Sequence, residues 1–284
     1  MQKGIYIATY ATGKKNIYHW LTIITLMMSS ICHAETFTIG IVPQFDARTI
    51  QQTWRPILKE LQQRTGHNFI LRGSQTIPVF EKQLLAGEFD FAYVNPYQLL
   101  KTSSPNVYTP LVRDIETDLR GILVVRKDSP YMKLEDLRDQ KIAFPSPNAL
   151  GASLMTRATL TREMKIPFKA RYVNSHDSVY LNVVLGNTAA GGGVASTLAH
   201  QSATVRDQLR ILHTTAAVAP HPLTAHPRVP EAIRNAVQQT MLSLGKTKSG
   251  IKLLSHIPIK TIAIAQMKDY DPLKKMRLDE FYED

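Results

Sequence analysis

The sequence predicts an α/β protein in which short apolar strands alternate with amphipathic helices. Strand, helix, strand, helix and strand follow one another through residues 36–94, and a second alternating series fills residues 120–213. A strand–helix–strand order implies parallel strands with helices on the faces of the sheet. We therefore expect two α/β units, followed by a C-terminal piece that returns to one of them. No internal repeat of fixed period is visible.

The first series contains three strands and two helices. Alternating or continuous apolar residues mark the strands at residues 36–42, 67–71 and 89–94. Apolar residues at helical spacing mark the first helix, which ends near Gly66: Trp54, Ile57, Leu58 and Leu61. The second helix covers residues 78–85, and Gly87 just beyond it is typical of a helix end.

The second series is longer and less regular. Its expected strands are residues 120–126, 141–144, 169–173, 188–194 and 210–213. A short helical turn is predicted at 134–137, a helix at 149–164 after the break at 145–148, and an apolar helical stripe at 179–185. The stretch 219–227 is rich in proline and histidine and is interpreted as a rigid linker. A last helix follows Pro230.

The first 34 residues have the layout of a secretory signal peptide. They hold Lys3, Lys14 and Lys15 but no acidic residue, then an apolar run over residues 20–31, then small residues before Glu35. The run is shorter than the about 20 residues that span a bilayer. Cleavage after Ala34 is expected, and the protein is then periplasmic. The alternative is a lipoprotein anchored at Cys32, which the bulky Ile31 disfavours.

Cleavage there leaves no cysteine, so no disulfide and no thiol catalysis are expected in the mature chain. The leader takes three of the 34 basic residues and none of the 23 acidic ones, leaving 31 against 23, a net charge of +8. This excess favours anionic small ligands. The basic residues are scattered and form no run, so a nucleic-acid partner is not expected.

Polar side chains follow the strand at residues 89–94. Tyr93, Asn95 and Tyr97 lie where this strand turns into a helix, and open α/β sheets bind ligands at such places. The helix start offers backbone N–H groups without partners. The alternative is an ordinary connection in which Asn95 and Pro96 only set the turn.

Other site chemistries are weakly supported. The sequence contains no G-x-S-x-G elbow of the kind that marks a serine hydrolase. The three glycines at 191–193 are not followed by Gly-Lys-Ser/Thr, so they do not form a phosphate-binding loop and are interpreted as allowing close approach of backbone segments. Spacings of eight and five residues separate His213, His221 and His226 in a proline-rich stretch, where no helix aligns them for a metal. No enzyme activity, metal or cofactor is therefore expected.

Taken in order, several motifs resemble those of periplasmic binding proteins from phosphonate, phosphite and phosphate ABC importers. They are the opening strand with Pro43, FDFAYVNPYQLL at 89–100, the segment 121–144, the Pro-Asn loop before the helix at 149, Ser175-His176-Asp177, and GGGV at 191–194. The likeness covers residues 35–284. It implies a type II binding-protein fold, in which two α/β lobes close over a ligand in a cleft at a two-strand hinge.

The resemblance also implies where the lobes divide. It places the crossing strands near residues 118–124 and 212–220 and returns the C-terminal segment to the first lobe. The expected parts are a signal peptide at 1–34, a first lobe at 35–118 with 221–284, and a second lobe at 119–220. Tyr93, Asn95 and Tyr97 would line the cleft from one side, and Asn148, Gly151, Ser153 and His176 from the other.

The chain departs from the family at the anion-binding loop. The family holds its phosphonate with a Ser-Thr-Ser stretch at a helix N-terminus, and here Ala149, Leu150 and Gly151 replace it. Backbone N–H groups remain, so an anionic end with a partly apolar remainder is expected as the ligand. The family's histidine is kept as His176, a candidate anion contact. The competing interpretation makes Ser175-His176-Asp177 a helix N-cap.

Two roles fit a protein that binds a small anion between two lobes. The first is a solute-binding protein that hands a small phosphonate- or phosphate-like anion to an ABC permease. The second is a ligand-sensing subunit that docks on a membrane sensor kinase or another signalling receptor. Both use closure of the lobes around a ligand.

Overall fold

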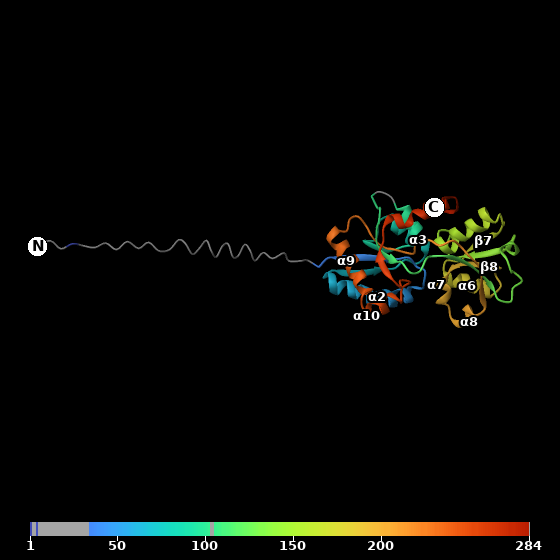
Figure 1. Ribbon diagram of the computed structural model, residues 1–284, viewed down its shortest axis with the longest axis horizontal. Helices are drawn as coiled ribbons and strands as arrows, with labels where there is room; N and C mark the ends of the chain where they lie inside the picture. The colour runs from blue at the N-terminus through green and yellow to red at the C-terminus, as the bar shows by residue number, and fades with distance from the viewer. Residues whose placement is uncertain (2–3, 5–33, 103–104, 284) are drawn as a thin grey trace. The chain divides into compact units, whose positions relative to one another are not determined.

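The computed structural model describes Met1, Gly4 and residues 34–102 and 105–283, and Thr36–Asp284 form one compact unit. Most of the predicted signal peptide therefore lies outside the described residues. Two sheets organise the compact unit, and we call the part around each sheet a lobe (Figure 1). The predicted two-lobe α/β fold is confirmed. Within the described ranges, no helix combines the length and the apolar character needed to cross a membrane.

The first lobe is built on a six-stranded sheet in the order β11-β4-β10-β3-β1-β2. Its strands are β1 (Thr36–Ile41), β2 (Asn68–Arg72), β3 (Phe91–Tyr93), β4 (Thr109–Asp114), β10 (Leu223–Ala225) and β11 (Ile262–Ile264). Its helical segments are α2 (Ala47–Thr65), α3 (Ile77–Leu85), α4 (Pro96–Lys101), α9 (Glu231–Leu244), α10 (Lys248–Leu254), η4 (Met267–Tyr270), α11 (Asp271–Lys275) and η5 (Leu278–Phe281).

The second lobe is built on a five-stranded sheet in the order β7-β6-β8-β5-β9. Its strands are β5 (Gly121–Arg126), β6 (Lys141–Phe144), β7 (Lys169–Tyr172), β8 (Ala190–Val194) and β9 (Leu209–Thr214). Its helical segments are η1 (Leu134–Leu137), η2 (Leu150–Met155), α5 (Thr156–Ala158), η3 (Thr159–Glu163), α6 (His176–Val184), α7 (Ala195–Ala199) and α8 (Ala203–Arg206). The chain passes between the lobes twice, and Leu119 and Val218 pair where it does so.

Local sequence explains the best-predicted helix. The side chain of Asp46 accepts a hydrogen bond from the Thr49 N–H at 3.0 Å and caps the start of α2. Gly66 ends the helix with φ +74°, a conformation that glycine adopts without strain. Between these caps the expected apolar stripe, which includes Trp54 and Leu61, is buried against the sheet.

The parallel strands expected in the first series are confirmed, since β1 pairs in parallel with β2 and β3, and β10 adds antiparallel to both β3 and β4. One expectation is wrong: the proline- and histidine-rich stretch is no linker, because it supplies β10 to the middle of the sheet. The Thr224 hydroxyl donates to the Ala92 carbonyl at 2.9 Å, which ties this three-residue strand to β3.

The helical stretch at residues 150–163 starts unusually close to the second sheet. A Cβ atom at Gly121 in β5 would lie 2.0 Å from the Gly151 carbonyl oxygen, and one at Gly192 in β8 would lie 2.0 Å from that of Ala152. Only glycine permits such an approach, so the role expected for residues 191–193 is confirmed at Gly192. Most of the stretch is π-helical (η2 and η3), a form found often at functional sites.

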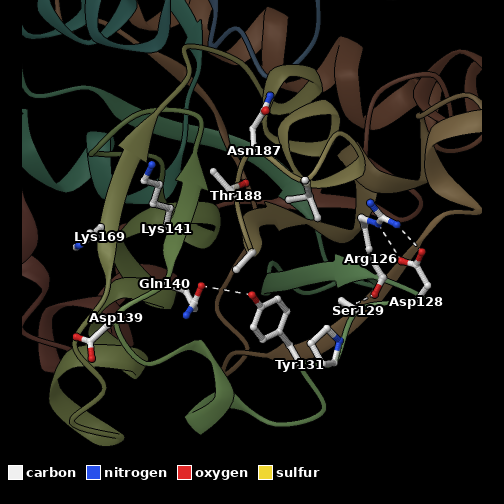
Figure 2. A pocket seen from close by; sticks show the side chains of 14 residues that line it. Arg126, Asp128, Ser129, Tyr131, Asp139, Gln140, Lys141, Lys169, Asn187 and Thr188 are labelled. Atoms are coloured by element: carbon white, nitrogen blue, oxygen red, sulfur yellow. Dashed lines mark hydrogen bonds and ion pairs between the residues drawn. The ribbon is translucent and has the colours of Figure 1, made fainter.

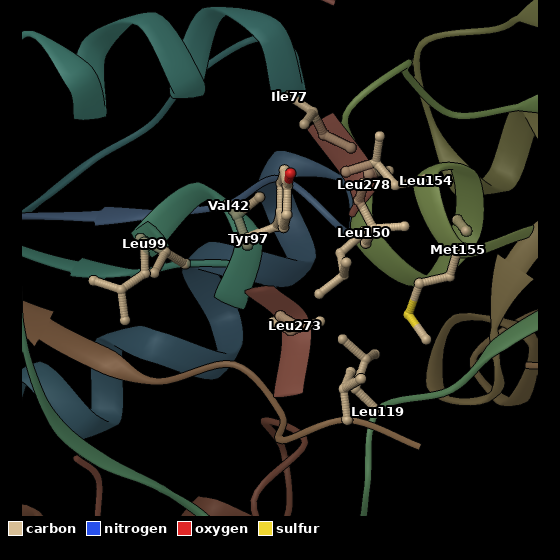
Figure 3. Close-up of a cluster of buried hydrophobic side chains, with 14 of the residues drawn as sticks. Val42, Ile77, Tyr97, Leu99, Leu119, Leu150, Leu154, Met155, Leu273 and Leu278 are labelled. Carbon is tan, nitrogen blue, oxygen red and sulfur yellow. The ribbon is translucent and has the colours of Figure 1, made fainter. Parts of the chain in front are cut away.

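One hydrophobic cluster runs across both lobes (Figure 3). Val42, Ile77 and Tyr97 belong to the first lobe, while Leu150 and Leu154 come from the helical stretch of the second. All five side chains are at most 3% exposed. Because apolar surface from both lobes leaves water together, the chain's own side chains stabilise this closed arrangement.

The C-terminal segment, residues 276–283, bridges the lobes. Toward the first lobe, Tyr282 donates its hydroxyl hydrogen to the carboxylate of Glu81 at 2.5 Å. Toward the second lobe, the Glu283 N–H donates to the side-chain oxygen of Asn148 at 2.9 Å, and Arg162 pairs with Glu280 at 2.7 Å. The segment is thus a third connection beside the two crossing strands, and separating the lobes would require breaking one set of these contacts.

Candidate functional site

A small cavity lies between the lobes, beyond the carboxyl ends of strands β1, β3, β6 and β8. Its volume is about 20 Å³, close to the space that one water molecule needs. Twelve residues line it: Val42, Gln44, Ile77, Asn95, Leu119, Ala149, Leu150, Gly151, Ala152, His176, Val194 and His221. Carboxyl ends of strands are where open α/β sheets bind ligands, so we take this cavity as the candidate site.

The first-lobe wall carries two amide side chains. Asn95 is the N-cap of α4: its side-chain oxygen accepts from the Gln98 N–H at 2.9 Å. Its amide nitrogen donates to the Asn148 carbonyl at 3.3 Å, across the gap between the lobes. Gln44 follows β1, and its side-chain nitrogen lies 2.8 Å from Nε2 of His221. Asn95 therefore both starts a helix and joins the lobes at the cavity.

The second-lobe wall is the start of the helical stretch at residues 150–163. Its N-cap is Ala149, which has no side-chain acceptor for the first N–H groups. Leu150, Gly151 and Ala152 line the cavity, and the N–H groups of a first turn have no partner within a helix. The wall therefore offers backbone donors, while the Leu150 side chain, 2% exposed, fills space beside them.

His176 lies at the first position of α6 and lines the cavity. Its Nδ1 is 3.3 Å from the Thr197 hydroxyl, and burial lowers the pKa of His176 from its ordinary 6.5 to about 4. The ring is therefore neutral at pH 7 in the ligand-free protein, and contact of His176 with an anion stays a prediction. The N-cap interpretation also holds for its neighbour, since the Ser175 hydroxyl accepts from the Ser178 N–H at 3.1 Å.

His221 lines the cavity, although from the sequence it was considered only as a metal ligand; Gln44 is another polar residue of the cavity that was not predicted. His221 lies just before β10, stacks on the Tyr93 ring with centroids 5.6 Å apart, and contacts Gln44. Burial and the nearby His176 lower the pKa of His221 to about 3. A histidine between prolines carries no local signal of this position, because pairing of β10 with β3 brings it there.

The other predicted site residues do not line this cavity. Tyr93 is buried beside Trp54, with ring centroids 5.1 Å apart. Burial and the nearby Asp279 of the C-terminal segment raise the pKa of Tyr97. The Asn148 side chain reaches Glu81 at 3.0 Å.

Ser153 is fully buried, and its hydroxyl has no hydrogen-bond partner within the described residues. Of the seven predicted residues, Asn95, Gly151 and His176 therefore meet at the cavity.

Two further cavities flank the central one. On the hinge side, a cavity of about 410 Å³ shares Gln44, Leu119, Val194 and His221 with it. The other, of about 220 Å³, shares only Gln44 with it. Small-molecule sites commonly occupy about 300–1,000 Å³. The polar side chains of the central cavity therefore lie beside enough space for a small molecule, although the central cavity itself has room for about one water molecule.

A separate cavity of about 470 Å³ lies in the second lobe, and Figure 2 draws the side chains that line it. It lies where β6, β7 and β8 begin, and Lys141, Lys169 and Thr188 are among its residues. Arg126 at its border is held by a salt bridge to Asp128. This is the opposite end of the sheet from the interlobe cavity, so it does not serve the same site.

The fold and this cleft define a class: two-lobed α/β proteins that bind a small molecule between their lobes. A family model described as the periplasmic substrate-binding protein of a phosphonate ABC transporter matches residues 39–270. The chain belongs to this family, and the resemblance drawn from its motifs is confirmed. Its role is that of the substrate-binding component of an ABC transporter, and nothing in these comparisons favours the signalling role.

Solved structures with the same fold share little sequence with this chain. A binding protein component of an ABC phosphonate transporter from Pseudomonas aeruginosa is 13% identical, with a TM-score of 0.77 over 86% of this chain and 85% of its own. PhnD1 from Prochlorococcus marinus, in complex with methylphosphonate, is 17% identical, with a TM-score of 0.75 over 85% and 96%. A Xanthomonas citri protein bound to ATP is 15% identical, with a TM-score of 0.71 over 87% and 99%.

Proposed function

We propose that the protein captures a small anion in the interlobe cleft and delivers it to an ABC permease. One observation carries this proposal. The start of the helical stretch at residue 150 has no side-chain cap, and it faces two amide side chains and two histidines in the cavity between the lobes. The N–H groups of residues 150–152 would hold the anionic end, favoured by the helix dipole. Asn95, His176 and His221 would complete its hydrogen bonds.

The remainder of the ligand is proposed to be partly apolar. Leu150, Ile77 and Val42 border the central cavity, and Ile122, Ile211 and Pro220 border the hinge-side cavity. Burying apolar ligand surface against such side chains is favourable. Leu150 also takes the place of a hydroxyl that the family uses, at a cost of ~1.5–3 kcal/mol for each lost charge-assisted bond.

A screen of oxyanions tests this function. We expect the thermal unfolding midpoint to rise with a sulfonate or carboxylate that carries an apolar group. It should rise little with simple alkylphosphonates, because the hydroxyl stretch that holds a phosphonate head in the family is missing here. Phosphate, phosphite, alkylphosphonates, 2-aminoethylphosphonate, sulfonates and carboxylates form the panel, and calorimetry gives affinities for those that bind. Sub-micromolar binding of 2-aminoethylphosphonate would show that loss of the hydroxyl stretch does not weaken phosphonate binding.

Export by a cleaved signal peptide is part of the proposal. N-terminal sequencing of protein recovered from the periplasm is expected to begin at Glu35, since small residues precede it after an apolar run. A lipid-bearing start at Cys32 would instead identify a membrane-anchored form.

A further inference from the structure

The two cavity histidines are buried, and no fixed charge lies beside them in the cavity. None of the twelve described residues that line it is Lys, Arg, Asp or Glu. An anion that entered this cavity would meet dipoles and neutral rings only. A buried ion without a countercharge is costly, and proteins commonly avoid that cost by moving a proton.

The contact between His221 and Gln44 matches a neutral histidine. An amide nitrogen only donates, so the Gln44 nitrogen at 2.8 Å makes Nε2 of His221 the acceptor and places the ring proton on Nδ1. A half-turn of the Gln44 amide would present its oxygen instead, and both ring nitrogens of a protonated His221 could then donate. Rotation of the Gln44 amide could therefore accommodate a second ring proton on His221.

The charged groups around the pair are already engaged. Beside His176, the carboxylate of Asp177 accepts from Gln201 at 2.6 Å, and the hydroxyls of Tyr180 and Thr197 bond each other at 2.7 Å.

In the hinge-side cavity next to His221, Asp118 pairs with Arg120 and Glu116 with Lys260, each at 3.9 Å. Behind Tyr93, the carboxylate of Asp114 accepts the N–H groups of Thr117 and Thr261. These carboxylates are paired with cations, accept backbone N–H groups or, in the case of Asp177, accept a side-chain amide. The histidines are therefore the groups proposed to change charge.

We infer that the cleft binds its anion together with one proton, taken up from solvent and held on His176 or His221. The inference rests on the proposed function and adds that the preferred ligand carries a single net charge, neutralised within the site by the histidinium. Binding should then strengthen as the pH falls.

The ligand-free protein should respond to acid in the opposite direction. Both histidines have a pKa in the fold below the 6.5 of the free side chain. The unfolded chain therefore binds more protons, and stability falls as the pH drops from about 6.5 towards 4. Acid should lower the unfolding midpoint of the free protein while it enlarges the upward shift caused by the anion.

Propane-1-sulfonate at millimolar concentration is a suitable probe, because it stays ionised at every pH of interest and any proton taken up must go to the protein. Calorimetry in two buffers of different ionisation enthalpy, at pH 5.5 and pH 7, counts that proton. We expect close to one proton per bound anion, with affinity rising towards about tenfold per pH unit. Binding without proton uptake, at an affinity that pH leaves unchanged, would overturn the inference.

Two other outcomes are decisive. If phosphate or phosphonates bind but propane-1-sulfonate does not bind even at pH 5.5, the proton lies on the ligand and the inference is wrong. If no anion of the panel binds at any pH, the proposed function itself is wrong.

A variant pair locates the proton. The double variant His176→Gln and His221→Gln keeps polar side chains but cannot take up a proton, so its remaining binding should not depend on pH. His256→Gln, at an exposed histidine, is the matched control and should keep the wild-type pH dependence. Should the double variant fail to fold, the two-buffer measurement on the wild-type protein decides the question alone.

Discussion

Replacing Gly192 with alanine is expected to lower the free energy of unfolding by about 1–3 kcal/mol, the usual cost of overpacking a close-packed core. The new Cβ atom would lie 2.0 Å from the Ala152 carbonyl oxygen and 2.6 Å from Cδ1 of Phe144. The first neighbour is backbone and the second is a fully buried ring, so neither can move aside cheaply. A urea titration followed by far-UV circular dichroism measures the change.

The same substitution should also weaken ligand binding. Any relief of the clash moves the start of the helical stretch at residues 150–163, and that start provides the N–H groups proposed to hold the anion. Gly73→Ala is the matched control, because a Cβ atom there meets nothing within 4 Å. We expect its stability to stay within ~0.5 kcal/mol of wild type. Equal stability of Gly192→Ala and Gly73→Ala would contradict the close packing of β8 against the helical stretch.

Replacing Leu150 with threonine should change stability and affinity in opposite directions. The substitution removes a 2%-exposed side chain from the cluster that joins the lobes, so a loss of about 2–5 kcal/mol in the free energy of unfolding is expected. It also places a hydroxyl at the start of the helical stretch, where one charge-assisted bond to an anion contributes ~1.5–3 kcal/mol. Methylphosphonate affinity should therefore rise by about ten- to a hundredfold, as calorimetry would show.

Leu154→Thr separates the two effects. Leu154 belongs to the same helical stretch and the same cluster and is also fully buried, but it does not line the cavity. Its replacement should cost similar stability without any gain in methylphosphonate affinity. If Leu150→Thr loses stability and its affinity stays at the wild-type value, the Leu150 side chain does not border the bound anion.

Local sequence was enough to predict most elements that short-range interactions form. The apolar spacing and Gly66 predicted helix α2, and the glycines of β8 predicted a close backbone contact. The turn at Asn95 was recognised as a helix start at the end of a strand, and it lies at the cavity. Apolar periodicity, helix caps and glycines depend on residues that are near in the sequence, so the elements that they define can be predicted from local sequence.

The sequence also anticipated that the helix start at residue 150 lacks side-chain donors. What it did not reveal is that Leu150 packs into a cluster spanning both lobes and leaves a central cavity of about 20 Å³. Burial of that side chain depends on Ile77 and Leu278, which lie far away along the chain. Packing between distant segments has no signature in local periodicity.

By itself, then, the sequence determined the alternating strands and helices, the family and the departure at Ala149, Leu150 and Gly151. The tertiary structure alone decided that β10 enters the first sheet and brings His221 to Gln44, and that Tyr97 turns towards Asp279. It also made His176 and His221 neutral, because a pKa depends on burial among side chains that folding gathers from both lobes. Secondary structure follows from near neighbours, whereas the chemistry of a cleft follows from strand pairing and packing across long stretches of chain.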